Sequence, residues 1–573
     1  MLRAVFISLA LLVGLLSVAA SAQQVGDRVA TITNAALRSG TDVTGTVPKG
    51  NILVVRKIDG DWFWVTWSGH ETLNGWVKRS DVTPLSRALD LFSDEVNQKP
   101  TASAYEARGT VWSWKGEYAI AIGDLSEAIR LDPNAASAYR RRGYAWARSK
   151  DYDKAIADYN EAIRLDPNDP IAYIGRGWVW NAKKDFDRAI ADDDAAVRLD
   201  AKDAAAYTYR GNAWQAKGQN EKAIADYDAA IHLDPKDAKA YVGRGWTRNA
   251  QKEFDRAIAD YSQAIGLNPQ DAVGYAYRGK AWSELKQNDR AIADYNEAIR
   301  LDPKNGVAYV GRGWAWNAKK EYDKAIADYT KAVELEPNDA MAYTYRGNVW
   351  QAKGIHDKAI ADYGEAISLD PTIVDAYSNR GSAWLGRGDL DRAISDFNDA
   401  LRLDPKDASV YGNRGFAWLQ KGDFEKALAD CNEIIRLDPK NASGYSARGS
   451  AWLAKGDFAQ AIADCREAVR LEPKRSNAYW GLAWMLATCP DARYRNGHEA
   501  VEYAEKAKAA FGLSDGVHVA VLAAAYAEAG DFASAVKWQT KARDMVSANQ
   551  KAAYQSRLEL FAALKPFRLE VKK

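Results

Sequence analysis

Histidine, cysteine and methionine are scarce in this chain, and their scarcity limits its chemistry. The 573 residues include only five histidines, three cysteines and four methionines. The histidines lie far apart, without the spacing of metal ligands: His70, His232, His356, His498 and His518. No phosphate-binding loop, nucleophile elbow or paired-carboxylate pattern accompanies them. We therefore predict a protein that is not an enzyme and that holds no metal and no cofactor.

An excess of positive charge is also missing. Lys and Arg total 78 against 77 for Asp and Glu, so the formal net charge is +1. Proteins that bind nucleic acid usually carry a basic surface that neutralises phosphates. We therefore predict no nucleic-acid partner.

Long apolar runs are absent except at the start of the chain. Residues 1–22 read MLRAVFISLALLVGLLSVAASA, with one Arg, an apolar run and a final Ala-Ser-Ala. This pattern is typical of a secretory signal peptide, with an uncleaved membrane anchor as the alternative. The next residue is Gln23 rather than Cys, which argues against a lipid anchor there. We predict a periplasmic or secreted protein with no stable membrane span after signal cleavage.

Two of the three cysteines follow a repeat. Cys431 and Cys465 are 34 residues apart and stand where other copies have an aromatic residue, such as Tyr159 or Phe397. This position predicts buried thiols in the core rather than a disulfide or a metal site.

Repetition is what the chain has in abundance. An Arg-Gly pair recurs every 34 residues, with its glycines at Gly109, Gly143, Gly177, Gly211, Gly245, Gly279, Gly313, Gly347, Gly381, Gly415 and Gly449. In the copy at residues 138–167, Tyr139, Gly143 and Trp146 form an apolar stripe with helical spacing. A second stripe follows after a break, and Pro167 ends it. Each copy is therefore predicted to be a hairpin of two helices.

Hairpins of this length must stack to be stable. Ordering the backbone costs about 1–2 kcal/mol per residue, which one apolar stripe does not offset. Burial against neighbouring copies supplies the rest. Ten of the eleven copies carry a tryptophan in the first-helix stripe, and Arg248 is the exception. We predict that these residues belong to the core: Trp112, Trp146, Trp180, Trp214, Trp282, Trp316, Trp350, Trp384, Trp418 and Trp452.

The repeat resembles the tetratricopeptide repeat (TPR) family. In the copy at residues 138–167 the matching positions are Tyr139, Gly143, Trp146, Tyr152, Ala155, Tyr159, Ala162 and Pro167. The resemblance covers residues 104 to about 546, with eleven regular repeats in 104–477 and two irregular repeats in 478–546. It implies a mostly α fold, a right-handed superhelical solenoid of about 13 hairpins that serves protein recognition.

An Arg and an Asp recur together in the regular repeats. All eleven have Arg before the glycine and Asp sixteen residues after that Arg, as in Arg312 and Asp328. The irregular repeats carry Leu482 and Leu522 at the Arg position and lose the Asp as well. We predict that the two residues pair, within a hairpin or across a junction. The alternative is a solvated charge on each helix, retained by duplication.

The chain ends differ from the repeats. Residues 23–85 have short β-rich runs separated by Gly and Asp and resemble a bacterial SH3-like (SH3b) β-barrel, in Leu37 to Gly40, Trp62 to Val65 and Gly75 to Val77. In that family the barrel binds cell-wall or other peptides. Its candidate contact residues are Trp62, Trp64, Trp67 and Trp76, of which alternation places some in the core. We predict a helical linker and N-terminal cap at 86–103 and a C-terminal capping helix and tail at 547–573.

The first helices supply the candidate binding residues. In the TPR family they line the concave face, which carries the residue after the glycine and the residue three positions on. These positions give a partner-binding set of Trp178, Asn181, Gln215, Trp246, Asn249, Trp314, Asn317 and Gln351. Amides can bond to an extended peptide backbone and tryptophan supplies stacking area. The alternative is a polar solvated face with its tryptophans packed against neighbouring repeats.

Two functions follow. We predict a non-catalytic protein–protein interaction scaffold of the bacterial envelope, which binds an extended peptide or a partner protein on the concave face. The alternative is an adaptor that binds peptidoglycan or cell wall through the SH3-like domain, with the repeats as a spacer.

Overall fold

The computed structural model describes residues 28–39, 42–47, 49, 51–68, 72–473, 478–513 and 515–569. The predicted signal peptide, residues 1–22, lies outside these ranges. Within them, no helix combines the length and apolar character needed to cross a bilayer.

The described chain begins with a seven-stranded antiparallel sheet. Its strands are β1 (Arg28–Thr31), β2 (Ala35–Ser39), β3 (Asp42–Val47), β4 (Ile52–Asp59), β5 (Trp62–Ser68), β6 (Thr72–Lys78) and β7 (Val82–Pro84), with a 3₁₀ turn at Arg79–Asp81. Their order across the sheet is β3-β2-β6-β5-β4-β1-β7. Strand alternation directs Leu37, Phe63, Val65 and Val77 into one core. This small β module was predicted, whereas its SH3 identity stays a prediction.

The sheet is packed against the first helices. A hydrophobic cluster joins Ala30 of β1 to Phe92 of α2 (Leu85–Gln98) and Val111 of the next helix. Polar contacts cross the same junction, because Arg141 donates to Asn51 Oδ1 (3.0 Å) and Lys49 pairs with Glu95. The β module is therefore packed directly against the first repeats.

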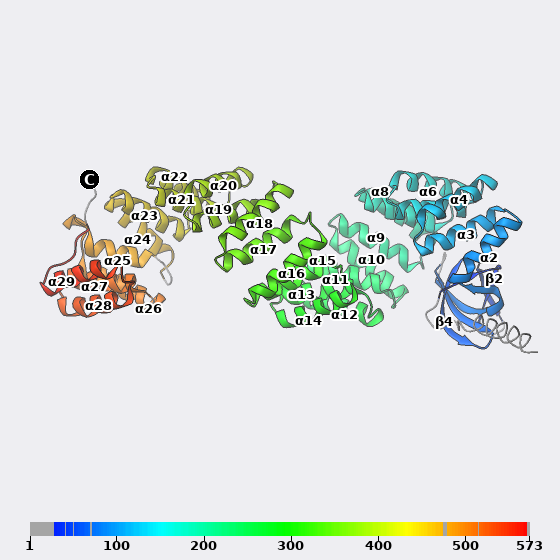
Figure 1. Ribbon diagram of the computed structural model, residues 1–573, viewed down its shortest axis with the longest axis horizontal. Coiled ribbons are helices and arrows are strands. Elements are labelled where there is room, and N and C mark those ends of the chain that lie inside the picture. Colours follow the sequence, from blue (N-terminus) through cyan, green and yellow to red (C-terminus); the bar gives the residue numbers. More distant parts are fainter. Residues whose placement is uncertain are drawn as a thin grey trace, which may run out of the picture. The chain divides into compact units, whose positions relative to one another are not determined.

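Helical hairpins make up the rest of the N-terminal part (Figure 1). They are α3 (Ala102–Lys115) with α4 (Tyr118–Leu131), α5 (Ala136–Arg148) with α6 (Tyr152–Leu165), α7 (Pro170–Ala182) with α8 (Phe186–Leu199), α9 (Ala204–Ala216) with α10 (Asn220–Leu233), α11 (Ala238–Ala250) with α12 (Phe254–Leu267), and α13 (Ala272–Glu284) with α14 (Asn288–Leu301).

The C-terminal part continues the pattern. Its hairpins are α15 (Gly306–Ala318) with α16 (Tyr322–Leu335), α17 (Ala340–Ala352) with α18 (His356–Leu369), α19 (Val374–Gly386) with α20 (Leu390–Leu403), α21 (Ala408–Lys421) with α22 (Phe424–Leu437), α23 (Ala442–Lys455) with α24 (Phe458–Leu471), α25 (Ala478–Thr488) with α26 (Gly497–Phe511), and α27 (Gly516–Glu528) with α28 (Phe532–Met545). A 3₁₀ turn, Ala492–Tyr494, lengthens one connection, and α29 (Lys551–Ala562) follows the last hairpin.

The chain divides after Pro303 into two compact units. Within each unit every helix packs against its hairpin partner and against the next hairpin, which is the contact pattern of a solenoid. The predicted mostly α solenoid of repeated hairpins behind a small β module is confirmed.

Close approach of the two helices explains the repeat glycine. A Cβ added at Gly211 would lie 2.8 Å from the ring of Tyr227 on the partner helix. Ala223 and Ala230 are buried on either side of that ring. Small residues therefore let an aromatic ring fill the space between two helices.

Candidate interaction face of the first helices

The repeat arginines are held in ion pairs within their hairpins. In all eleven regular repeats the guanidinium lies within 2.6–2.8 Å of the Asp sixteen residues on. Arg312 donates through Nε (2.8 Å) and Nη2 (2.6 Å) to the two oxygens of Asp328. The Asp side chains are nearly buried, and hydrogen bonding to Asp328 raises the pKa of Arg312. The pair is therefore a fixed bidentate contact.

Most of the same arginines also donate to a residue of the preceding hairpin. Arg176 Nη1 donates to Asn160 Oδ1 (2.6 Å) and Arg414 Nη1 to Asn398 Oδ1 (2.6 Å). Each guanidinium lies over the tyrosine three residues earlier on its own helix, as Arg176 lies 5.7 Å from the Tyr173 ring centroid. Such an arginine therefore connects two hairpins and also lies over a tyrosine ring of its own helix.

The stripe tryptophans are partly buried and covered by a cation. Eight of them have a Lys or Arg from the second helix 4.2–4.8 Å from the ring centroid, at Trp146, Trp180, Trp214, Trp282, Trp316, Trp350, Trp384 and Trp418. Where Arg248 replaces tryptophan, it instead pairs with Asp260 at 2.8 Å. These tryptophans contribute packing and cation–π contacts to their hairpins.

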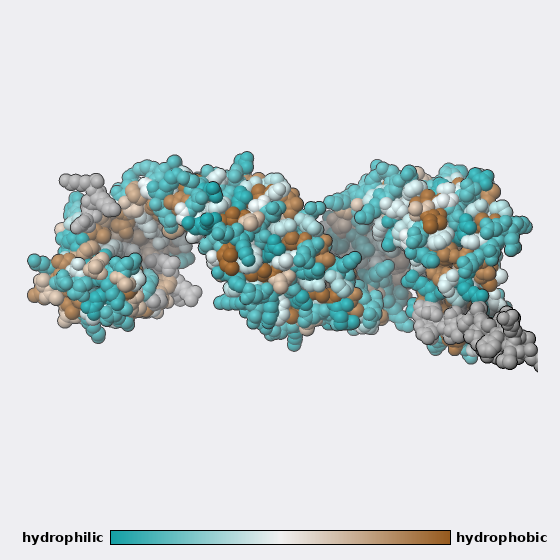
Figure 2. All heavy atoms as spheres, viewed as in Figure 1, coloured by the Kyte–Doolittle hydropathy of each residue, from teal (hydrophilic) through white to brown (hydrophobic). Residues whose placement is uncertain are grey.

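The first helices form a common face within each unit. First helices of successive hairpins contact one another, so their outward sides lie next to each other. We call this surface the groove face, defined by the residue after the repeat glycine and the residue three positions later. Figure 2 shows separate hydrophobic patches within a mostly hydrophilic surface.

The N-terminal unit brings five of the predicted residues onto neighbouring helices. Trp178 and Asn181 lie on α7, Gln215 on α9, and Trp246 and Asn249 on α11. Trp246 is 39% exposed, whereas Trp178 is partly buried against the cluster of the preceding hairpin. The Oδ1 atom of Asn249 is buried and has no hydrogen-bond partner. A tryptophan surface and an unused acceptor therefore occur on the same helix.

The C-terminal unit holds the other three. Trp314 and Asn317 lie on α15 and Gln351 on the adjacent α17. Trp314 is 42% exposed, and Asn317 is partly buried. Gln351 Oε1 accepts a hydrogen bond from Tyr363 (2.9 Å), so this amide is engaged with the core.

The predicted set omits other aromatic residues at the same repeat position. Tyr144 is 46% exposed and Phe416 is 52% exposed, and each directly follows a repeat glycine. Trp484 occupies the equivalent place in the irregular α25, where Ala483 replaces the glycine. The sequence could have identified them, because each occupies the same position of the 34-residue repeat as Trp246 and Trp314.

One repeat departs from the pattern of its core. Asp193 stands where neighbouring copies have a tyrosine, and it is 1% exposed. Its Oδ1 has no hydrogen-bond partner and lies 2.7 Å from where a Cβ at Gly177 would be. Burial raises the pKa of Asp193 well above its usual range, and the neighbouring Asp192 raises it further. This hairpin contains an unsatisfied carboxyl group in its core.

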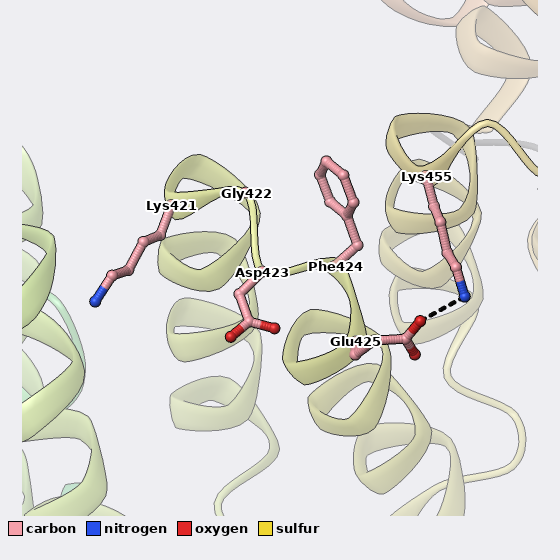
Figure 3. A pocket seen from close by; sticks show the side chains of 6 residues that line it. All are labelled: Lys421, Gly422, Asp423, Phe424, Glu425 and Lys455. Carbon is pink, nitrogen blue, oxygen red and sulfur yellow. Dashed lines mark ion pairs between the residues drawn. The ribbon is translucent and has the colours of Figure 1, made fainter. Parts of the chain in front are cut away.

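A surface depression of about 460 Å³ lies at the α21–α22 turn (Figure 3). Its charged side chains are already engaged, since Lys455 pairs with Glu425 at 2.6 Å and Lys421 pairs with Asp391. Asp423 caps α22 by accepting from Lys426 N (3.3 Å). These contacts leave the depression without a free charge for a ligand.

The cysteines are buried thiols. Cys431, Cys465 and Cys489 are all free and buried. Burial raises the pKa of Cys431 and of Cys465 to about 12, so both thiols are protonated at neutral pH. Within the described residues, no three His, Cys, Asp or Glu side chains gather in an arrangement suited to a metal ion.

The sheet carries its own aromatic cluster. Trp64 and Trp76 are cross-strand partners on β5 and β6, with ring centroids 5.4 Å apart and planes at 69°. Trp62 shares their side of the sheet and has Lys78 5.7 Å from its ring centroid. All three tryptophans are partly exposed on the side opposite Phe63 and Val65. The side chain of Trp67 lies outside the described part of the chain.

Helical hairpins that stack one on the next define the class of helical-repeat proteins. The chain belongs to the tetratricopeptide repeat family. Models described as "Tetratricopeptide repeat" match residues 115–170, 159–204, 209–272, 346–408, 378–442 and 446–488, and further ones match 306–339 and 272–305. The first set alone covers more than half of the chain.

Solved structures are similar to this chain. The APC/C hetero-tetramer Cut9–Hcn1 is 15% identical, with a TM-score of 0.41, over 77% of this chain and 93% of that chain. Yeast Tom70 is 18% identical, with a TM-score of 0.37, over 75% and 96%. YrrB, described as a TPR protein with an unusual peptide-binding site, is 26% identical, with a TM-score of 0.30, over 33% and 97%. No curated protein sequence matches the chain.

Proteins built from this repeat are generally protein-interaction scaffolds. They bind proteins or peptides, and their fold is typically non-catalytic.

Proposed function

We propose that this chain is a non-catalytic scaffold of the bacterial envelope and that its groove face binds an extended segment of a partner protein. The observation that carries the proposal is the exposure of Trp246 (39%) and Trp314 (42%) on first helices of the repeat. A buried tryptophan position would offer a ligand nothing, whereas an exposed ring supplies stacking area at low entropic cost.

Amide groups support the same ligand chemistry. Asn249 lies three residues after Trp246, so both side chains share one side of α11. Its Oδ1 is buried, but the side chain is partly exposed, so its amide N–H₂ can donate a hydrogen bond to a backbone carbonyl of an extended peptide. The ligand would therefore offer a main-chain carbonyl beside an apolar side chain.

A peptide array tests the proposal. Wild-type full-length protein and the Trp246→Ala and Trp314→Ala variants are probed against overlapping peptides that cover the proteins of the native envelope. Removal of an anchoring tryptophan typically costs about 2 kcal/mol or more of binding free energy. The affinity for each bound peptide should therefore fall about thirtyfold.

The control removes an exposed apolar side chain from a second helix. Ile120 on α4 is 46% exposed, and Ile120→Ala should leave every peptide affinity unchanged. Equal binding by the wild type and both tryptophan variants would contradict the proposal.

Envelope location rests on residues 1–22. Expression of the full chain in a bacterium, followed by fractionation, should place it in the periplasm or medium with Gln23 as its first residue. If the protein instead stays in the cytoplasm and keeps residues 1–22, the proposed envelope location is wrong.

A second candidate function is cell-wall binding by the β module. The observation that favours it is the outer-face cluster of Trp62, Trp64 and Trp76. In sedimentation with purified peptidoglycan, wild-type protein should pellet and a Trp64→Ala variant should stay in solution. If both proteins stay in solution, the module has a packing role alone.

A further inference from the structure

The C-terminal tail returns to a groove-face position of the last hairpins. After α29 ends, Leu564 takes a left-handed conformation (φ 57°) and turns the chain back. We call the extended segment that follows, Lys565–Leu569, the tail strap. Pro566 favours an extended backbone at Lys565, so the strap leaves α29 without continuing the helix. Figure 1 shows α25, α27, α28 and α29 gathered at this end of the chain.

Three kinds of contact hold the tail strap. The ring of Phe567 packs against Trp484 on α25, with centroids 5.8 Å apart. The guanidinium of Arg568 lies 2.6 Å from Glu528 Oε2 on α27. The backbone N–H of Leu569 donates to the carbonyl of Thr488 at the end of α25 (2.9 Å). The strap is therefore bound by a tilted aromatic contact, by an ion pair and by one main-chain hydrogen bond.

A fourth side chain completes the receiving surface. Arg557 of α29 lies 5.4 Å from the Trp484 ring centroid and 4.7 Å from that of Phe567. Phe567 thus contacts both an indole ring and a guanidinium, which also contact each other, and both favour an aromatic ring. We call Trp484, Thr488, Glu528 and Arg557 together the strap site.

The strap site matches the groove face of the regular repeats. Trp484 follows Phe416 by 68 residues and occupies the repeat position of Trp246 and Trp314. The tail therefore places an aromatic side chain on a groove-face tryptophan.

The tail strap makes few contacts, and the side chains of Phe567 and Arg568 stay partly exposed. Only a short extended segment, held by the side chains of Phe567 and Arg568 and by one main-chain hydrogen bond, has to be displaced for the surface to open.

We propose that the strap site is a binding site for an extended peptide in which an aromatic residue is directly followed by arginine, and that the chain's own tail occupies it in competition with such a partner. This inference concerns the terminal hairpins and stands whether or not the regular repeats bind a partner. Because the tail is tethered beside the site, its effective concentration is in the millimolar range, and a peptide in trans binds weakly until the tail is weakened.

A competition experiment tests the proposal on the full-length protein. The probe is a fluorescent synthetic peptide with the sequence of residues 563–569, ALKPFRL. The double variant Phe567→Ala/Arg568→Ala removes the two side chains that hold the tail while keeping the chain length. Fluorescence anisotropy should give saturable binding to this variant that is at least tenfold tighter than binding to the wild type.

Matched controls separate the site from general stickiness. A peptide with its Phe replaced by Ala should bind the double variant at least tenfold more weakly, as should the original peptide after Trp484→Ala is added. Adding Ile120→Ala in place of Trp484→Ala should change nothing, because Ile120 lies on a second helix outside the groove face. Circular dichroism of each variant checks that its helices are intact, and the single variant Arg568→Ala replaces the double variant if that protein unfolds.

The opposite result is equally clear. If the peptide shows no saturable binding to a folded tail variant, or binds equally well without its phenylalanine, the tail is a structural cap and the proposal is wrong.

Discussion

Arg380 differs from other junction arginines in a single contact. Its Nε and Nη2 atoms bind Asp396, as in every regular repeat. The residue that would accept from Nη1 is Gly364, where other hairpins have an acceptor such as Asn398. A Cβ at Gly364 would lie 3.8 Å from Nη1, which leaves space for a side chain. The junction before α19 therefore lacks one hydrogen bond that its neighbours have.

Gly364→Asn should restore this contact and stabilise the protein. Replacing a helix-interior glycine gains up to about 1 kcal/mol of helix propensity, and a hydrogen bond to a charged donor adds about 1 kcal/mol or more. Thermal unfolding should therefore rank Asn above Ala at position 364. Gly123, with no atom within 4 Å of an added Cβ, is the matched control, and there Ala should rank above Asn. The same order at both positions would show that no bond to Arg380 forms.

The carboxyl of Asp193 is the clearest local defect of the repeats. Asp192 and Asp226 flank it, paired with Arg176 and Arg210 respectively. Arg210 also pairs with Asp194 (2.8 Å), so the nearby cations are already engaged. Ionised Asp193 therefore lacks a partner of its own.

Asp193→Asn should stabilise the protein at neutral pH by about 1–3 kcal/mol, since the neutral amide avoids burying a charge. The folded-state pKa of Asp193 is raised, so its destabilising effect is absent below the unfolded pKa of about 4 and grows as pH rises toward the folded pKa. Urea denaturation of both proteins should give equal stabilities below about pH 4 and a widening gap above it. A gap that does not change with pH would mean that Asp193 is not the titrating group.

At the scale of the elements, the turn between the two helices of a hairpin is the variable part. In the eleven regular repeats a residue of left-handed conformation follows the first helix, and glycine adopts this conformation without strain. Gly354 has φ 74° at this position, and Lys252 has φ 63° at the corresponding position of another hairpin. The same turn is thus built with and without its preferred residue.

Lys252→Gly should stabilise the protein by about 1 kcal/mol, because it removes the strain of a side chain in the left-handed region. The reverse change, Gly354→Lys, should cost a similar amount. Thermal unfolding measures both. Opposite signs of the two effects are expected, and a loss of stability in Lys252→Gly would show that the lysine side chain contributes more than the strain costs.

The element scale also explains why one repeat position gives different surfaces. Trp178 and Trp246 follow equivalent glycines, yet Trp178 packs on the cluster around Tyr159 and Trp246 is 39% exposed. The spacing of the repeat predicted that both lie on first helices. Packing against the preceding hairpin decides how much of each ring a ligand can reach.

At the scale of the whole chain, contacts run between neighbouring hairpins. In such an array stability is close to a sum of repeat and junction terms, so damage stays local. The described chain follows this pattern, since each helix contacts its own hairpin and the adjacent ones.

Tyr227→Asp should copy the Asp193 defect into a second hairpin and test this locality. Tyr227 is fully buried, so an unpartnered carboxyl group there should cost several kcal/mol. Hydrogen exchange followed by mass spectrometry should show faster exchange in α9–α12 and unchanged exchange in α17–α24. Faster exchange throughout the chain would indicate a single cooperative unit instead.

The residues alone predicted the hairpins, their 34-residue repeat and an ion pair between each repeat Arg and the Asp sixteen residues on. Whether that pair lies within a hairpin or across a junction was left open, and the structure shows it within the hairpin. These features depend on contacts within one repeat, where helical periodicity sets which side chains meet. Only the packing of separate elements settles the rest: the contact of most repeat arginines with the preceding hairpin, the exposure of each groove-face tryptophan, and the return of Phe567 to Trp484. Those contacts join residues from different elements, and a local pattern carries no information about which distant surface packs against it.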